Sequence, residues 1–276
     1  MRVLAINDLS CVGKCSLTVT LPILSACGVE CTVLPTAILS THTGGFTGYT
    51  FHDLTSELPA ILAHWKSLGL KFDFIYSGYL GSIDQIELVS SIKKEFLAEN
   101  GTFIVDPVMG DEGKLYAGFT AEYVNAMKAL CAEADYILPN ATEAAFLSGV
   151  EYPLTRENVD KALVELSKLS LPVITGVKDG ADICVFFSGK NGGKYSFTHE
   201  NVEGFFCGAG DVFASAFVAC LARGKHTAEA IYLASEFATA AIRRSAKEVP
   251  DKKYGLNFEA EIFPFLLALQ SLDKKA

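Results

Sequence analysis

The chain has 276 residues, 50% hydrophobic and 20% charged, so it holds enough apolar side chains for a large buried core. Its 32 acidic residues outnumber 23 basic ones, and a net charge of −9 argues against nucleic acid or an anionic membrane as partner. No stretch has the length and apolar character of a membrane span or secretory signal, so we expect a cytoplasmic protein.

The eight cysteines lie mostly in apolar segments, which is typical of reduced thiols in a protein core. The pairs Cys11/Cys15 and Cys27/Cys31 have three intervening residues and no histidine nearby, so we expect no structural zinc.

Short β-rich runs alternate with segments of helical periodicity through most of the chain. The expected strands are 3–6, 31–39, 72–76, 102–105, 136–138 and 172–175. The expected helices between them are 16–25, 54–67, 85–97, 121–130 and 156–168. This alternation predicts a three-layer α/β fold with a mostly parallel central sheet flanked by helices, formed by residues 1–276 as a single domain.

The pattern changes near the end of the chain. Residues 183–187 and 194–198 flank a glycine-containing turn and predict an antiparallel hairpin, which an all-helical part follows. Its helices are expected at 210–221, 227–245 and 258–272, with Pro264 kinking or splitting the last. Asn140 and Thr155 are expected to cap two earlier helices.

The sharpest motif is Gly208-Ala-Gly-Asp211, which leads from a loop into an apolar helix. Backbone N–H groups and the helix dipole favour negative charge there, so the loop suits a phosphoryl group. Asp211 in the first turn is placed to accept the proton of an attacking hydroxyl, although an aspartate here also serves as a simple helix cap. No P-loop motif is present, and Phe213 replaces the third glycine of a dinucleotide fingerprint.

Three further segments follow expected strands. Asp106 and Asp111 belong to an acidic segment that suits magnesium but is also an ordinary acidic turn. Asn140 and Glu143 lie at the expected start of a helix, and the first interpretation of them is a helix cap. His42 lies in a glycine-bearing loop, where it either contacts a substrate or is solvated.

DPVMGD at 106–111, LPNATEA at 138–144 and GAGD at 208–211 resemble, in order and spacing, the ribokinase-like superfamily and its vitamin kinases. THTGG at 41–45 and SGY at 77–79 are similar to the pyridoxal kinase branch. The resemblance runs over nearly the whole chain. It implies transfer of a phosphoryl group from Mg-ATP to the hydroxymethyl group of pyridoxal, pyridoxamine or pyridoxine, and a monovalent cation is a further candidate ligand.

The resemblance also implies residue roles. Asp211 would be the base, and the anion hole would comprise Gly208, Ala209 and Gly210. The ATP phosphates and magnesium would lie near Asp106, Asp111, Asn140 and Glu143, with Asp106 and Glu143 as the metal candidates. Thr175 would lie near the nucleotide, and Tyr116 would belong to a flap. Vitamer contacts would come from His42, Thr43 and Tyr79.

The chain departs from the pyridoxal kinase pattern at Asp8 and Ser10, where relatives offer a serine to the vitamer ring. Either residue fills that role, and an acid at position 8 would favour pyridoxamine. The alternatives are a hydroxymethylpyrimidine or hydroxymethylpyrimidine phosphate kinase, a non-catalytic vitamer or nucleotide sensor, and a structural or interaction protein. The apolar late helices are compatible with a homodimer.

Overall fold

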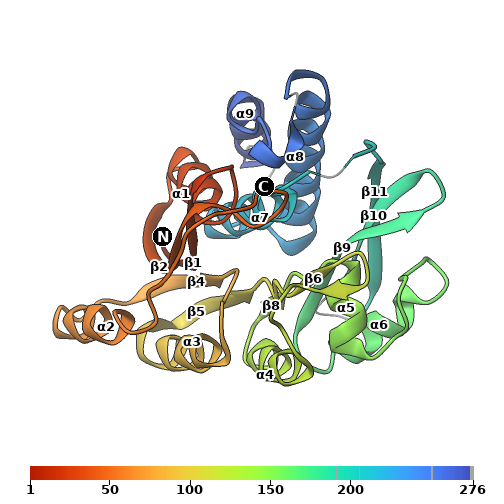
Figure 1. The fold of residues 1–276 in the computed structure, drawn as a ribbon. Helices are drawn as coiled ribbons and strands as arrows, with labels where there is room; N and C mark the ends of the chain where they lie inside the picture. Colours follow the sequence, from red (N-terminus) through yellow and green to blue (C-terminus); the bar gives the residue numbers. More distant parts are fainter. Residues whose placement is uncertain (190–191, 205, 250, 274–276) are drawn as a thin grey trace. The chain divides into compact units, whose positions relative to one another are not determined.

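A computed structural model describes residues 1–189, 192–204, 206–249 and 251–273 of the chain, with side chains up to 271 (Figure 1). Two compact units are present. Unit 1 comprises Met1–Asp53 and Asn201–Ala276, and unit 2 comprises Leu54–Glu200. The expectation of a single domain stays a prediction.

Unit 1 contains a small sheet in which β2 lies between β1 and β3. Its strands are β1 (Arg2–Val12), β2 (Glu30–Thr41) and β3 (Phe51–Asp53). β1 and β2 are parallel, whereas β3 runs antiparallel to β2. The run from Val3 to Ile6 is completely buried, which explains its continuous apolar character.

Helices of unit 1 pack on this sheet and on one another. They are α1 (Leu17–Ala26), α7 (Ala209–Ala222), α8 (Thr227–Glu248) and α9 (Ile262–Asp273), with short 3₁₀ turns at Lys252–Tyr254 and Glu259–Glu261. α1 contacts β1, β2 and α7, and α7 also packs against α8. Because α7 is buried on nearly every side, its sequence is apolar all round.

Pro264 lies two residues after the point where the expected segment 258–272 is divided into the Glu259–Glu261 turn and α9, so a split near this proline is found as predicted. Pro264 occupies the third position of α9, directly after the Glu259–Glu261 turn. Proline is tolerated in a first turn because the N–H groups there have no intrahelical partner.

Unit 2 contains most of the parallel strand pairs. Its strands in spatial order are β4 (Phe72–Ser77), β5 (Leu97–Val105), β8 (Tyr136–Ile137), β9 (Leu171–Asp179), β10 (Asp182–Ser188) and β11 (Lys194–Glu200). The pairs from β4 to β9 are parallel, and β10 is antiparallel to both β9 and β11. A separate miniature hairpin pairs β6 (Gly110–Asp111) with β7 (Lys114–Leu115), which the sequence did not predict.

The helices of unit 2 connect these strands. They are α2 (Leu58–Ser67), α3 (Ile83–Phe96), α4 (Ala121–Cys131), α5 (Ala141–Ser148) and α6 (Val159–Leu166). Asn140 caps α5 as predicted, whereas α6 begins at Val159, later than expected, after Asn158, which makes no side-chain capping bond. The Thr155 hydroxyl instead accepts the Glu157 N–H at 3.3 Å in a preceding turn.

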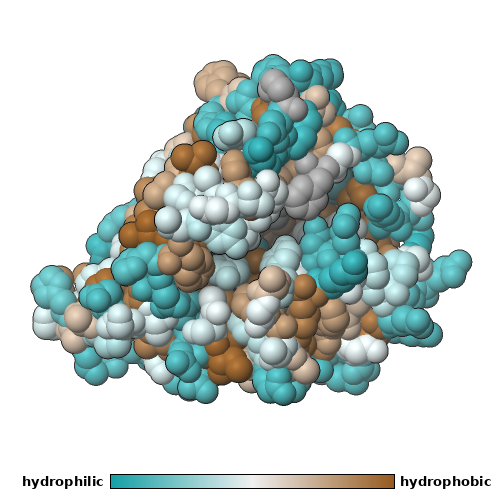
Figure 2. All heavy atoms as spheres, in the orientation of Figure 1, coloured by the Kyte–Doolittle hydropathy of each residue, from teal (hydrophilic) through white to brown (hydrophobic). Residues whose placement is uncertain are grey.

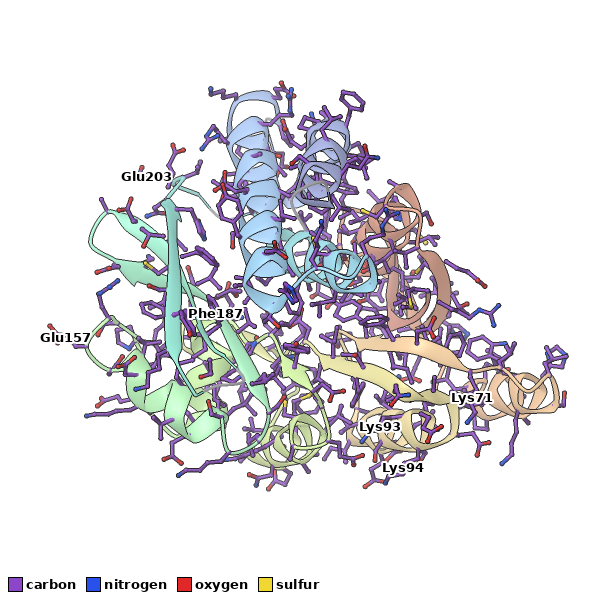
Figure 3. The ribbon with its side chains drawn as sticks, turned by 180° about the vertical axis from the view of Figure 1, so that it is seen from behind. Lys71, Lys93, Lys94, Glu157, Phe187 and Glu203 are labelled. Atoms are coloured by element: carbon purple, nitrogen blue, oxygen red, sulfur yellow. The ribbon has the colours of Figure 1, made fainter. Side chains whose placement is uncertain are left out.

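The hairpin of β10 and β11 carries an aromatic face. Phe187 on β10, which is labelled in Figure 3, stacks with Tyr195 and Phe197 of β11 at centroid distances of 5.4 and 5.6 Å. Cross-strand aromatic pairs of this kind stabilise an antiparallel pair. The predicted hairpin is present, although residues 190 and 191 of its turn lie outside the described residues.

The surface mixes hydrophilic and hydrophobic residues, and apolar residues gather over the position of α1 on the face shown in Figure 2. All eight cysteines are free thiols, and seven of them are buried or partly buried. Within the described residues, no helix has the length and apolar character needed to span a bilayer.

Candidate active site

The predicted site residues are divided between the two units, and each unit contains one polar cluster. Unit 1 holds the base cluster, which we define as Asn7, Asp8, Ser10, Ser16 and Asp211. Unit 2 holds the acidic loop cluster, which we define as Asp106, Asp111, Asn140 and Glu143. Each is described within its own unit.

Asp211 lies in the first turn of α7, as the sequence predicted. The helix begins after Gly208, which has φ of 79° in the left-handed region and whose carbonyl accepts the Val212 N–H at 2.9 Å. The first N–H groups of a helix have no intrahelical acceptor and point outward from its end. The Asp211 carboxyl therefore lies beside a group of donors suited to an anion.

The Gly208 turn is held closely against the segment around Lys14. A Cβ atom at Gly208 would clash with the Lys14 carbonyl oxygen, and one at Gly255 would lie 2.7 Å from the same oxygen. The Lys14 N–H donates to the Tyr254 carbonyl at 3.1 Å. A Cβ at Gly210, by contrast, would meet nothing within 4 Å. Gly208 is therefore required for packing, whereas Gly210 borders open space.

Asp8 is buried, with 5% exposure, and lies at an irregularity of β1. The pairing of β1 with β2 changes register between Asn7 and Leu9, opposite a stretch of β2 that begins at Pro35. Such a bulge redirects a side chain. The Asp8 carboxylate accepts hydrogen bonds from the hydroxyls of Ser10 at 3.0 Å and Ser16 at 2.5 Å.

Burial raises the pKa of Asp211 to about 7, and the nearby Asp8 carboxylate adds to this increase. The Ser16 main chain and the Asn7 side chain act on this pKa in the opposite direction. Burial also raises the pKa of Asp8, although the Ser16 and Ser10 hydroxyls oppose that change. A carboxyl with a pKa near neutrality suits a general base.

His42 is buried and uses both ring nitrogens in main-chain contacts. Nδ1 accepts the Gly44 N–H at 3.0 Å, so Nε2 donates to the Lys253 carbonyl at 2.6 Å. The ring therefore holds the 42–44 loop to the Lys253 main chain. Thr43 in that loop is exposed, and the predicted vitamer contacts of both residues stay predictions.

In unit 2, the acidic loop cluster is built around the start of α5. The Asn140 side-chain oxygen accepts the N–H groups of Thr142 and Glu143, and the Glu143 carboxylate accepts the Asn140 N–H in return. Glu143 also accepts the Met109 N–H at 3.1 Å, while the Asn140 amide donates to the Gly110 carbonyl at 2.8 Å. The cap residues thereby bind the loop that carries Asp111.

Glu143 is 2% exposed, and burial raises its pKa, with a further contribution from Asp111. Asp106 is also buried, and its N–H donates to the Ser77 carbonyl at 2.8 Å. Thr175 is joined to this region because its N–H donates to the Pro139 carbonyl at 3.0 Å. Asp106 thus follows β5, Glu143 lies in the first turn of α5, and Thr175 lies within β9 beside the 139–140 segment.

Tyr79 and Tyr116 occupy the periphery of the same unit. The Tyr79 ring lies 5.9 Å from that of Phe119, which itself stacks on Tyr123 at 3.9 Å. The Tyr116 N–H donates to the Met109 carbonyl at 2.9 Å, and its side chain is exposed. Tyr116 directly follows the β6–β7 hairpin, and its place in a flap stays a prediction.

The sequence model of the family described as Phosphomethylpyrimidine kinase matches residues 21–255 of this chain. The chain belongs to this kinase family. The predicted resemblance to ribokinase-like vitamin kinases and the predicted kinase class are thereby confirmed.

Individual members of the family agree with this assignment. A pyridoxine kinase of Bacillus subtilis is 32% identical over 188 residues, which is 64% of this chain and 66% of that protein. A crystallised pyridoxal kinase from Lactobacillus plantarum is 33% identical with a TM-score of 0.90, covering 96% of each chain. A Bacteroides thetaiotaomicron family member crystallised with pyridoxal is 35% identical with a TM-score of 0.90, covering 96% of this chain and 95% of its own.

These structural matches confirm the predicted α/β class with a mostly parallel central sheet flanked by helices. The chain spans 49% and 66% of the lengths of curated relatives from Caenorhabditis elegans and Bacillus subtilis. Particular activities and ligands of family members are therefore considered below as proposals for this chain.

The acidic loop cluster can be compared with the needs of the magnesium ion that kinases of this family imply. Among the described residues, no group of three or more histidine, cysteine, aspartate or glutamate side chains forms a protein-only metal site. Mg²⁺ is commonly held by one or two carboxylates together with substrate phosphates and water. Two buried carboxyls, Asp106 and Glu143, fit that arrangement, because a cation relieves the cost of burying their charge.

The sequence did not single out several residues that shape these sites in this family member. Ser16 contacts both carboxyls of the base cluster, and Lys14 fills the space beside Gly208 and Gly255. Thr142 accepts the Gly113 N–H at 2.9 Å and so holds the flap hairpin to α5. Ser16 and Lys14 lie outside the motifs, and Thr142 lies within LPNATEA without any pattern that shows its contact with Gly113.

Proposed function

We propose that this protein transfers the γ-phosphoryl group of ATP to the hydroxymethyl oxygen of a B6 vitamer, forming its 5′-phosphate. The observation that carries the proposal is the Asp211 carboxyl beside the open N-terminus of α7, with a pKa raised to about 7 by burial. A sensor or structural protein has no need of a carboxyl tuned in this way.

In this reaction Asp211 is the general base. Its carboxylate accepts the proton of the vitamer hydroxymethyl group while the oxygen forms a bond to the γ-phosphorus. The bond between that phosphorus and the β–γ bridging oxygen breaks, and ADP leaves with the electron pair. The N–H groups around Gly208, Ala209 and Gly210 stabilise charge on the transferring phosphoryl oxygens.

The acidic loop cluster serves the nucleotide in this proposal. Asp106 and Glu143 are the candidates to hold magnesium, which when bound neutralises phosphate charge. Asp111, Asn140 and Thr175 contribute to the ATP phosphate region, and Tyr116 covers it from the flap. The close bonding of Asn140 and Glu143 to the 109–110 loop supports a rigid platform.

The vitamer is assigned to the early loops of unit 1. Asp8 or Ser10 faces the ring, and an acid at position 8 favours a protonated amine such as pyridoxamine. Support comes from the Lactobacillus plantarum pyridoxal kinase and the Bacteroides thetaiotaomicron relative crystallised with pyridoxal. The family description favours hydroxymethylpyrimidine or its phosphate as a second acceptor, since the same hydroxymethyl chemistry applies.

The test is product mass after incubation with Mg-ATP and, separately, pyridoxal, pyridoxamine, pyridoxine and hydroxymethylpyrimidine. We expect a phosphorylated B6 vitamer, with turnover lowered about 10²–10⁴-fold in Asp211→Asn. Phosphorylation of hydroxymethylpyrimidine alone would favour the second acceptor. Absence of every product would support a sensor, and full activity of Asp211→Asn would contradict the base assignment.

A further inference from the structure

Ser16 has a backbone conformation that serine rarely adopts. Its φ of 53° and ψ of −130° lie in a region that favours glycine, because a Cβ atom is crowded there. Serine is a common helix N-cap, yet the Ser16 hydroxyl makes no capping bond to α1. A strained residue with a redirected side chain needs a compensating contact.

That contact joins two carboxyls. The Ser16 hydroxyl donates to Asp8 at 2.5 Å, and the Ser16 main-chain N–H hydrogen-bonds to Asp211. Asp8 belongs to β1 and Asp211 to α7, segments about two hundred residues apart in the sequence. Both partners and Ser16 belong to unit 1.

We propose that Ser16 is a positioning residue for the reaction, fixing the Asp211 base and the Asp8 carboxylate relative to one another through its main-chain N–H and its hydroxyl. This inference rests on the proposed base role of Asp211. The left-handed backbone of Ser16 allows this one residue to direct both donors at the carboxyls.

The arrangement predicts a chain of electrostatic effects. The Ser16 hydroxyl stabilises the charged form of Asp8, and the Asp8 charge disfavours ionisation of Asp211. Removing the hydroxyl therefore makes Asp8 harder to ionise and Asp211 easier to ionise. Three other titratable groups interact electrostatically with these two carboxyls, namely Cys15, His42 and Cys207. Asp251 in turn acts on Cys207.

The experiment compares Ser16→Ala with Ser16→Gly. Both lose the hydroxyl and keep the N–H, but only glycine relieves the backbone crowding. We expect both to move the acid limb of the kcat/KM profile to lower pH, by roughly 0.5 pH unit, although Ser16→Gly melts at a higher temperature than Ser16→Ala. In an Asp8→Asn background, Ser16→Ala should cause little further shift.

Ser215→Ala is the matched control. Its buried hydroxyl donates to Thr20 at 3.0 Å between α7 and α1, without contact to either carboxyl. It should lower stability and leave the acid limb in place. A purely structural role for Ser16 would give that same result in Ser16→Ala, which would overturn the proposal.

Carboxyl ¹³C titration of Asp8 and Asp211 separates this inference from the proposed activity, because it requires no turnover. A lower Asp211 pKa in both Ser16 variants supports the positioning role even if no vitamer is phosphorylated. Unchanged titration of both carboxyls contradicts it even if the wild-type protein is an active kinase.

Discussion

At the scale of single residues, Asp211 combines a position beside helix N–H donors with a carboxyl that burial makes hard to ionise. The sequence predicted its place in the first turn but not its pKa. The raised value arises from the surrounding segments, including Asp8 of β1, which lies far away in the sequence. Ser16 is similar, since its two contacts depend on how α1 begins against β1 and α7.

The Asp211 pKa predicts a dependence of stability on pH. The folded-state pKa of about 7 exceeds the ordinary 3.8, so the folded protein favours the protonated carboxyl. Ionisation therefore costs stability as pH rises from about 4 to about 7. Asp211→Asn should be more stable than wild type by about 4 kcal/mol at pH 8, with the difference shrinking toward pH 4.

Urea unfolding of the two proteins at several pH values measures this difference. Glu165→Gln provides a control, because Glu165 in α6 forms a surface ion pair with Lys168, just after that helix, and lies outside both clusters. A constant difference between Asp211→Asn and wild type across this range would contradict the raised pKa.

At the scale of elements, the two glycines at the start of α7, Gly208 and Gly210, have different roles. Gly208→Ala must place a Cβ against the Lys14 carbonyl at a φ of 79°, which should destabilise the protein by about 2–3 kcal/mol. Gly210→Ala adds a methyl group where nothing lies within 4 Å, so its stability should change by less than about 1 kcal/mol.

Turnover, unlike stability, should be affected by Gly210→Ala. If the open space at Gly210 receives the phosphoryl group, Gly210→Ala lowers kcat at least about tenfold while folding normally. Denaturant unfolding and steady-state kinetics on both variants provide the measurement. An active Gly210→Ala enzyme would show that this space is not used by the transferring group.

Elements also show where local sequence patterns succeed. The alternation of strands and helices is found as expected, and Asn140 caps α5 in a reciprocal bond with Glu143. The start of α6 was placed too early, because Thr155 caps a turn that precedes the helix, and the break near Pro264 falls before the proline, where a 3₁₀ turn ends. Several competing start signals within a few residues cannot be ranked without their tertiary contacts.

At the scale of the whole molecule, the homodimer stays a prediction. α9 presents Phe263 and Leu267, with 68% and 53% exposure, one helical turn apart on its surface. Burying such a pair against a second copy is favourable. Light scattering should give twice the chain mass of 29.7 kDa, and Phe263→Glu should return the mass to that of a monomer. A monomeric wild-type protein would contradict this prediction.

The sequence by itself determined the α/β class, the kinase family and the order of the site motifs. Hydrophobic periodicity, caps and glycine-rich turns act between near neighbours, and the motifs retain their spacing in the chain. Only the tertiary structure decided that Ser16 joins Asp8 to Asp211, that Lys14 requires glycine at 208, and that burial raises the Asp211 pKa. Burial and close backbone approach depend on segments far apart in sequence, whose contacts leave no local pattern.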